Sequence, residues 1–116
     1  MLEKRKSQRI PLQMNLQICD LYKQDASGIH HLDAPIELTD ISEQGIGFIS
    51  ECILPLQYHF HACLSLDSKK DFLIALKINR CSVMDRDHYY YGCEFIALDD
   101  TVRDIIRQYI SSKSTS

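Results

Sequence analysis

Apolar and polar residues alternate through most of this chain, and the alternation defines the elements that we expect. Every second residue between Leu12 and Asp20 is apolar, and the same period recurs over residues 59–66 and 72–84. Because successive side chains of a strand point to opposite faces, each segment is predicted to be a half-buried strand. The inward faces are Leu12, Met14, Leu16 and Ile18; Phe60, Ala62, Leu64 and Leu66; and Phe72, Ile74, Leu76 and Ile78.

Three further segments are expected to be extended. Residues 29–39, with Ile36 and Leu38 inward, lead into a polar stretch that residues 46–50 follow, and residues 88–96 form a Tyr-rich last strand. The remaining segments carry turn and loop residues. They are the loop over residues 21–28, the segment ended by Pro55, and the turns at 67–71 and 85–87.

The period changes at the C-terminal end, where apolar residues follow the i, i+3, i+4 spacing of an amphipathic helix over residues 99–112. The stripe consists of Val102, Ile105, Ile106, Tyr109 and Ile110, and Asp99, Asp100 and Thr101 are N-cap candidates. About six short strands with short connections favour closure of the sheet, which removes exposed edges. We therefore predict an all-β, six-stranded antiparallel β-barrel over residues 12–98 with a C-terminal α-helix.

Composition agrees with one folded domain. A chain of 116 residues can bury about two-thirds of the surface that its unfolded form exposes. No apolar run approaches the roughly 18 residues of a membrane span, and the charges at residues 1–6 precede no apolar segment, so a secretory signal is not expected. A cytoplasmic protein is the prediction, with its five cysteines, at positions 19, 52, 63, 81 and 93, as reduced thiols.

Positive charge is concentrated at the start of the chain. The first nine residues hold four basic side chains and one acidic, a charge of +3, so residues 10–116 carry −6 of the total of −3. A basic arm over residues 1–11 thus precedes an acidic body. This distribution indicates a local anion site and argues against a broad DNA-binding face.

A polar stretch from Asp40 to Gly45 connects the strand expected to end at Thr39 with the strand that starts at Ile46. Asp40 supplies an acceptor-only carboxylate, Ser42 a hydroxyl that donates or accepts, and Gly45 a backbone without a side chain. Such a corner can bind the flat polar edge of a ligand. The same residue types also form ordinary turns.

Arg5 and Arg9 lie four residues apart in the basic arm. If the arm is extended, their Cα atoms are roughly 13 Å apart, which lets them clasp opposite sides of one bulky anion. A guanidinium suits this role because its planar fork binds a phosphate, or O6 and N7 of guanine, with two hydrogen bonds. A solvated basic terminus is the alternative.

Together these two motifs resemble the paired signature of PilZ domains, bacterial receptors for cyclic di-GMP. Arg-x-x-x-Arg is matched by Arg5 and Arg9, and Asp-x-Ser-x-x-Gly by Asp40, Ser42 and Gly45. Residues 92–95 also look like the Gly-x-x-Phe segment common in the family's last barrel strand. The resemblance extends from Lys4 to the terminal helix.

The resemblance implies a six-stranded barrel whose N-terminal arm wraps over cyclic di-GMP. Arg5 and Arg9 would bind phosphates and guanine edges, and Asp40 would accept from guanine N1–H or the N2 amine. Ser42 would add a hydrogen bond and Gly45 a close backbone approach. Lys4, a further basic residue, either favours a stacked pair of nucleotides or is a plain solvated lysine.

The arm also suggests how a signal is passed on. Its like charges and few apolar residues predict that it orders only when ligand phosphates neutralise it. The changed surface would then regulate an unidentified effector protein in trans, in motility, biofilm formation, secretion or virulence. The alternatives are a nucleotide-independent PilZ-like protein of pilus biogenesis, and binding of nucleic acid or an anionic membrane surface through the arm.

His59, His61 and Cys63 form a separate group on one face of a predicted strand, about 7 Å apart in succession. Two histidines so spaced can chelate zinc, with His30, His31 or His88 as further ligands. A solvent-facing row is the stronger interpretation, so no metal is expected. No motif of a hydrolase, phosphate loop or metalloprotease occurs, and the protein is not expected to be an enzyme.

Overall fold

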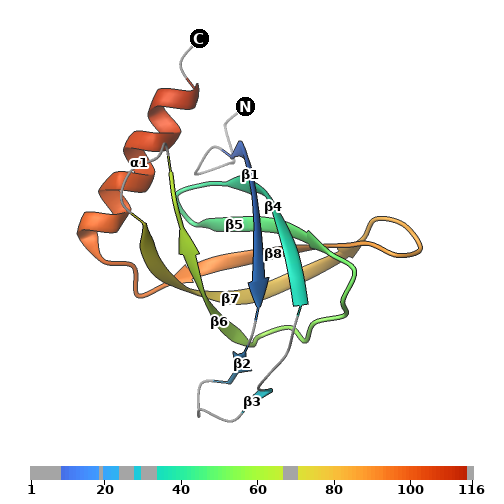
Figure 1. Ribbon diagram of the computed structural model, residues 1–116. Helices are drawn as coiled ribbons and strands as arrows, with labels where there is room; N and C mark the ends of the chain where they lie inside the picture. Colours follow the sequence, from blue (N-terminus) through green and yellow to red (C-terminus); the bar gives the residue numbers. More distant parts are fainter. Residues whose placement is uncertain (1–8, 19, 24–27, 30–33, 67–70, 115–116) are drawn as a thin grey trace, which may run out of the picture.

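The protein is described by a computed structural model that covers residues 9–18, 20–23, 28–29, 34–66 and 71–114. Within these ranges, eight strands and one helix follow one another (Figure 1). They are β1 (Ile10–Ile18), β2 (Leu21–Tyr22), β3 (Gly28–Ile29), β4 (Ala34–Ile41), β5 (Gly45–Ser50), β6 (His59–Leu64), β7 (Phe72–Val83), β8 (Tyr89–Ile96) and α1 (Asp100–Ser114).

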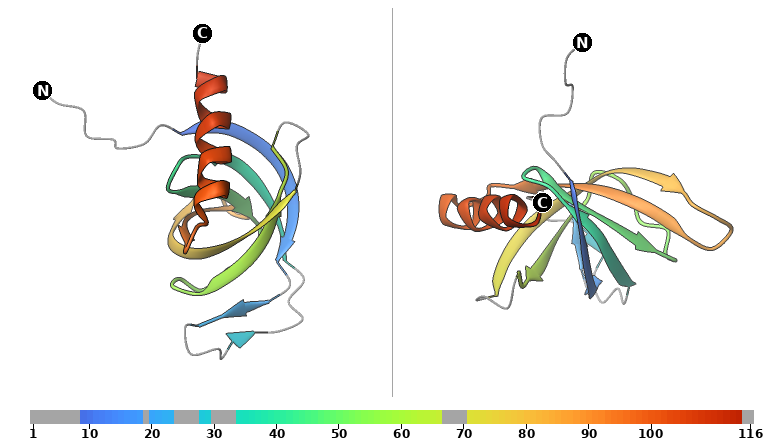
Figure 2. Two further views of the ribbon diagram at one scale, coloured as in Figure 1. Left: turned by 90° about the vertical axis from the view of Figure 1, so that its left-hand side faces the viewer. Right: turned by 90° about the horizontal axis from the view of Figure 1, so that it is seen from above.

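All strand pairs are antiparallel and belong to one sheet, in the order β1-β4-β5-β8-β7-β6-β2-β3. The sheet curls until β1 approaches β6, and α1 stands outside the curled wall (Figure 2). This confirms the predicted antiparallel β-barrel with a C-terminal helix. The barrel is not fully closed, because no ladder joins β1 to β6 in the described part of the chain.

The strand count differs from the predicted six. The extra strands, β2 and β3, lie at the two ends of the segment that was predicted to be a loop. Leu21 pairs with Ile29 and Tyr22 with Gly28. Strands of two residues are too short to show alternation in the sequence, which is why the prediction was wrong there.

The core confirms the predicted inward faces. All the inward residues are buried except Met14, Leu16 and Phe72, which are partly exposed and pack against the core. Phe48 lies at the centre, with ring centroids 6.0 Å from Phe60 and 5.2 Å from Tyr91. The alternation therefore determined which face of each long strand is apolar.

The helix α1 begins where the cap residues predicted. The backbone N–H of Arg103 donates to the carbonyl of Asp99 at 2.9 Å, which puts Asp99 at the N-cap position. Ile106 and Ile110 are buried against the sheet, while the rest of the apolar stripe is partly exposed. In the described residues no helix is long and apolar enough to cross a membrane.

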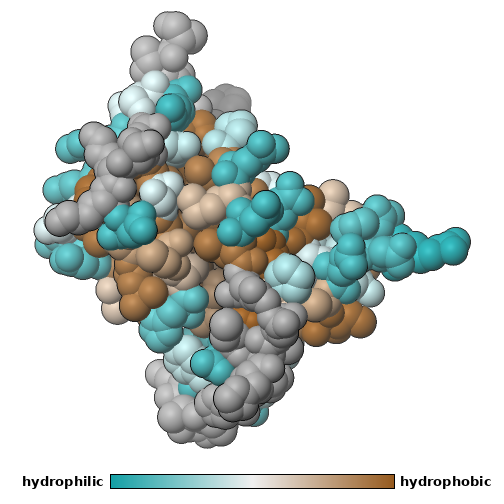
Figure 3. Space-filling view, in the orientation of Figure 1, coloured by the Kyte–Doolittle hydropathy of each residue, from teal (hydrophilic) through white to brown (hydrophobic). Residues whose placement is uncertain are grey.

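The β7–β8 hairpin extends away from the barrel, on the side opposite α1 in Figures 1 and 2. Its tip, residues 85–87, is exposed and hydrophilic (Figure 3). The pKa of His88, next to the tip, is raised by a hydrogen bond with Asp85. The hairpin end is therefore a charged surface, distant from the helix end of the molecule.

Candidate functional site

A β-bulge in β4 turns Asp40 to the outer face of the sheet. Leu38 and Ile41 are both fully buried although they are three residues apart, a spacing that a regular strand cannot put on one face. The register shifts between Leu38, which pairs with Phe48, and Asp40, which pairs with Gly47. The extra residue, Thr39, changes the phase of the strand.

Asp40 therefore lies within a strand, not after it as the sequence predicted. The prediction ended the strand at Thr39 because two outward polar residues in succession look like the start of a turn. The turn itself is shorter, covering residues 42–44 between β4 and β5.

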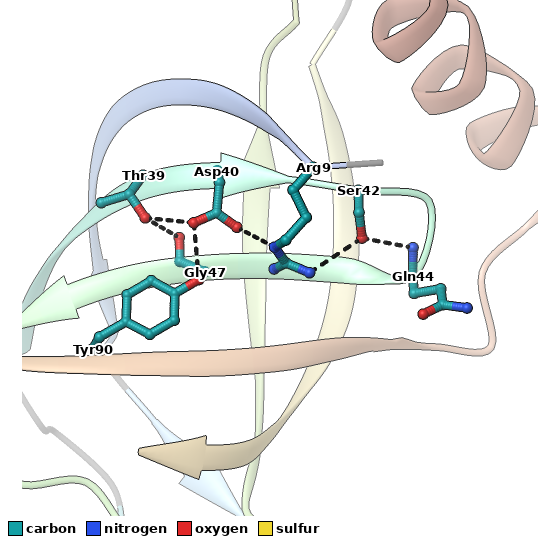
Figure 4. A network of polar contacts seen from close by, with 7 residues as sticks. All are labelled: Arg9, Thr39, Asp40, Ser42, Gln44, Gly47 and Tyr90. Carbon is teal, nitrogen blue, oxygen red and sulfur yellow. Dashed lines mark hydrogen bonds and ion pairs between the residues drawn. The ribbon is translucent and has the colours of Figure 1, made fainter. Parts of the chain in front are cut away.

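Asp40 is the centre of a polar network on this outer face (Figure 4). The Nε of Arg9 donates to Oδ1 of Asp40 at 2.7 Å, across a sequence separation of 31 residues. The hydroxyls of Thr39 and Tyr90 both donate to Oδ2 at 2.8 Å. Residues from the start of β1, from β4 and from β8 thus converge on one carboxylate.

The network keeps Asp40 ionised. Burial alone would raise the pKa of this carboxyl, but hydrogen bonds from Thr39, Tyr90 and Arg9, with the positive charge of the guanidinium, lower it below its ordinary value. The pKa of Tyr90 moves the other way. Burial is the largest cause and raises the pKa of Tyr90, and the hydrogen bond to the carboxylate of Asp40 raises it further. At neutral pH the pair is therefore a carboxylate acceptor and a neutral phenol donor.

Ser42 is fully buried and holds the turn together. Its Oγ accepts a hydrogen bond from the backbone N–H of Gln44 at 3.1 Å, and its own N–H donates to the carbonyl of Gly45 at 2.9 Å. An Nη1 donor of Arg9 lies 3.5 Å from the same Oγ. Ser42 thus links the turn to the arginine that binds Asp40.

Gly45 allows β5 to approach β8. A Cβ at this position would lie 1.8 Å from the carbonyl oxygen of Cys93, a backbone atom that cannot move aside. Burial raises the pKa of the Cys93 thiol to about 12, so this cysteine is a small apolar side chain at neutral pH. The glycine is therefore required by strand packing, in addition to any contact with a ligand.

A cavity of about 620 Å³ opens beside this network, between the β4–β5 turn, strands β7 and β8, and the start of α1. Among the described residues, three guanidiniums line it, from Arg9, Arg80 and Arg103, together with two carboxylates, from Glu43 and Glu94. Glu43 also pairs with Arg107 of α1 at 3.0 Å, which connects the turn to the helix. The predicted polar corner thus borders a basic cavity large enough for a ligand.

Comparison with known families agrees with this arrangement. A family model described as PilZ domain matches residues 3–112. The chain belongs to the PilZ family.

A solved structure shares the fold of this PilZ domain. It is the PilZ domain with c-di-GMP of YcgR from Escherichia coli, to which the chain is similar with a TM-score of 0.64 at 18% identity, over 95% of this chain and 91% of that one. No curated protein sequence matches the chain. The predicted family and fold are confirmed.

The structure brings together some of the residues that were predicted to bind a ligand. Arg9 contacts both Asp40 and Ser42, and it lines the cavity together with Gly45. Lys4 and Arg5, and with them most of the predicted arm, lie outside the described residues. Strand β1 already begins at Ile10, two residues before the predicted start of the barrel.

Three residues at this site were missed by sequence reasoning: Thr39, Tyr90 and Arg80. Thr39 and Tyr90 hold the carboxylate, and Arg80 lines the cavity. Alternation along β8 was the available signal for Tyr90, since an inward Tyr91 puts Tyr90 on the outer face. The sequence pattern did not point to Arg80, because its position opposite Gly92 depends on a register shift between Ile78 and Arg80.

The histidines of β6 are engaged by an aromatic ring. The ring of Tyr22 stacks on His61 at a centroid distance of 5.4 Å and meets His59 edge-on at 5.5 Å. The Tyr22 hydroxyl lies 3.2 Å from Nε2 of His61. His88 lies near Asp85 and Glu51 instead, and His30 and His31 are outside the described residues. Within the described ranges no three side chains are grouped so that they could hold a metal ion.

Proposed function

We propose that this PilZ protein is a cyclic di-GMP receptor that regulates a partner protein, and that it is a binding protein and not an enzyme. The observation that carries the proposal is the 2.7 Å contact between Arg9 and Asp40 at the edge of a basic cavity. It joins the two halves of the family signature in one site. The similar YcgR domain, which has c-di-GMP in its structure, supports the same ligand.

Arg9 is already oriented for a ligand in this site. Its Nε donates to Asp40 and one Nη1 donor points to Ser42, so the other N–H groups of the fork remain available. Side chains fixed before binding lose less conformational entropy when the ligand arrives. We infer that Arg9 donates to a phosphate oxygen or to O6 and N7 of one guanine.

Asp40 supplies the complementary acceptor. Because its pKa is lowered, the carboxylate accepts hydrogen bonds at neutral pH and donates none. Guanine offers N1–H and an N2 amine to such an acceptor, whereas adenine lacks both donors on the corresponding edge. The site should therefore prefer cyclic di-GMP over cyclic di-AMP.

The remaining signature residues complete the proposed site. Arg5 and Lys4 would add positive charge from the arm, Ser42 would fix the turn and Arg9, and Gly45 would keep the backbone accessible beside the cavity. Ordering of residues 4–10 on binding would change the surface that the partner protein meets. Regulation of motility, biofilm formation, secretion or virulence is the proposed output.

Isothermal titration of cyclic di-GMP tests the proposal. Arg9→Ala and Asp40→Ala should each weaken binding by at least about 30-fold, since truncating one partner of a hydrogen-bonded charge pair costs about 2 kcal/mol or more. Arg86→Ala is the matched control, because Arg86 is exposed at the hairpin tip and does not line the cavity. Circular dichroism should show that all three variants are folded.

Two results would contradict the proposal. One is an absence of cyclic di-GMP binding by the wild-type protein, which would favour a nucleotide-independent interaction protein. The other is wild-type affinity in both Arg9→Ala and Asp40→Ala. Equal affinity for cyclic di-AMP would contradict the role given to Asp40.

A further inference from the structure

Four residues form a row across the outer face of the sheet. In the strand register Asp40 of β4 pairs with Gly47 of β5, Gly47 with Gly92 of β8, and Gly92 with Arg80 of β7. Neighbouring strands are about 4.8 Å apart, so the two ends of the row are separated by roughly 14 Å. A carboxylate at one end thus faces an arginine at the other, with two glycines between them.

The glycines leave space for polar side chains to lie flat on the sheet. A Cβ on Gly47 would lie 1.9 Å from the Tyr90 hydroxyl and 2.7 Å from Oδ2 of Asp40. A Cβ on Gly92 would lie 2.6 Å from Nε and 3.1 Å from Cγ of Arg80. Arg80 therefore lies back across β8, along the floor of the cavity that it shares with Arg9.

The positive charge of Arg80 is not used within the described part of the molecule. Glu94, the carboxylate on the same strand as Gly92, accepts a hydrogen bond from Asn79 at 2.6 Å, and Glu43 pairs with Arg107. Among the residues that the structure describes, none forms a hydrogen bond or ion pair with Arg80. All five N–H donors of this exposed guanidinium thus remain available in the cavity.

We propose that Arg80 is a third ligand-binding arginine, which donates to the phosphate of the cyclic dinucleotide that lies farther from Asp40. The inference rests on the proposed function and extends it. Arg9 and Asp40 bind one nucleotide, the two glycines let the side chains of Tyr90 and Arg80 lie flat on the sheet beneath the ligand, and Arg80 binds the other nucleotide's phosphate. A ligand with two phosphates would therefore be held at both ends of the row.

Two substitutions separate the charge of Arg80 from its packing. Arg80→Met keeps an apolar stem over Gly92 and removes the charge, whereas Arg80→Lys keeps the charge without the planar fork. For a phosphate contact we expect Arg80→Met to weaken cyclic di-GMP binding about tenfold. Arg80→Lys should stay within about threefold of wild type. Arg86→Met is the matched control and should bind like wild type.

The outcomes of this titration are distinguishable. If wild type binds, Arg9→Ala does not, and Arg80→Met binds like wild type, the inference about Arg80 is wrong while the proposed function stands. If wild type does not bind cyclic di-GMP, the proposed function itself is wrong. An ammonium also binds phosphate as a point charge, so Arg80→Lys should keep most of a phosphate contact. Equal losses of cyclic di-GMP affinity in Arg80→Met and Arg80→Lys would therefore overturn the phosphate assignment.

Salt dependence gives a second measurement. An exposed charge is screened by salt, so the loss of affinity between low and high ionic strength should be smaller for Arg80→Met than for wild type. The same salt dependence in both proteins would argue that Arg80 makes no charged contact with the ligand.

Discussion

Two polar clusters on the outside of the same barrel have different architectures. Around Asp40, side chains from several strands converge next to a cavity, and glycines on β5 and β8 leave room for the side chains of Tyr90 and Arg80 to lie across the sheet. Around Tyr22, the imidazoles of His59 and His61 come from a single strand and are covered by one aromatic ring. Both clusters consist of outward-facing side chains, but only the first combines unused N–H donors, a fixed carboxylate acceptor and an adjoining cavity.

The difference shows what makes an outward polar row into a site. Side chains on one strand are about 7 Å apart and point in parallel, so they cannot converge without a partner strand. Bulges in β4 and β7, together with glycines, bring residues of different strands to one place. Four experiments test this contrast, in order of expected effect.

The largest effect is expected from Gly45→Ala. The new methyl group would overlap the backbone carbonyl of Cys93, so β5 and β8 must separate. We expect the free energy of unfolding to fall by about 3 kcal/mol, measured by urea denaturation. Gly92→Ala is the control, because the obstacle there is the flexible side chain of Arg80. Equal losses in the two variants would contradict a backbone role for Gly45.

Tyr90→Phe should have a smaller effect on the first cluster. It removes the 2.8 Å hydrogen bond to Asp40, which should lower the free energy of unfolding by about 1 kcal/mol and raise the pKa of Asp40. Denaturation and carboxyl titration by NMR measure the two quantities. Tyr89→Phe is the control on the same strand, since its hydroxyl has no hydrogen-bond partner in the described residues. An unchanged pKa in Tyr90→Phe would show that the phenol does not hold the carboxylate.

Acid should weaken the Asp40 cluster. The pKa of Asp40 in the folded protein lies below its ordinary value of 3.8, so the ionised carboxylate stabilises the folded protein fully above pH 3.8. The effect is lost as the pH falls through the lower pKa of the folded state. Asp40→Asn should therefore be less stable than wild type at pH 7, with the difference shrinking below pH 3.8. Denaturant titrations across this range provide the measurement, and a constant difference would contradict the assigned ionisation.

The smallest effect is expected at the second cluster. His61→Ala removes one exposed ring contact, so the free energy of unfolding should change by only about 0.5 kcal/mol. Stoichiometric zinc should leave the Tm of the wild-type protein unchanged, since the described residues offer no third ligand beside His59 and His61. A zinc-dependent rise in Tm that His61→Ala abolishes would show that this cluster is a metal site.

Much of the fold was readable from local pattern. Alternation identified the inward faces of the long strands, and the change of period identified α1. The paired motifs, Arg5 with Arg9 and Asp40 with Ser42 and Gly45, identified the family. Each of these signals depends on residues close together in the chain or on a motif of fixed spacing. Short strands such as β2 gave no signal, because two residues cannot show a period.

Register between strands could not be derived in that way. It depends on how whole faces of the sheet fit together, and a shift of one residue moves a side chain to the other face. The bulge at Thr39 placed Asp40 on the outer face, and the bulge between Ile78 and Arg80 brought Arg80 opposite Gly92. The sequence by itself supplied the two motifs of the proposed site, and only tertiary packing decided which side chains are neighbours.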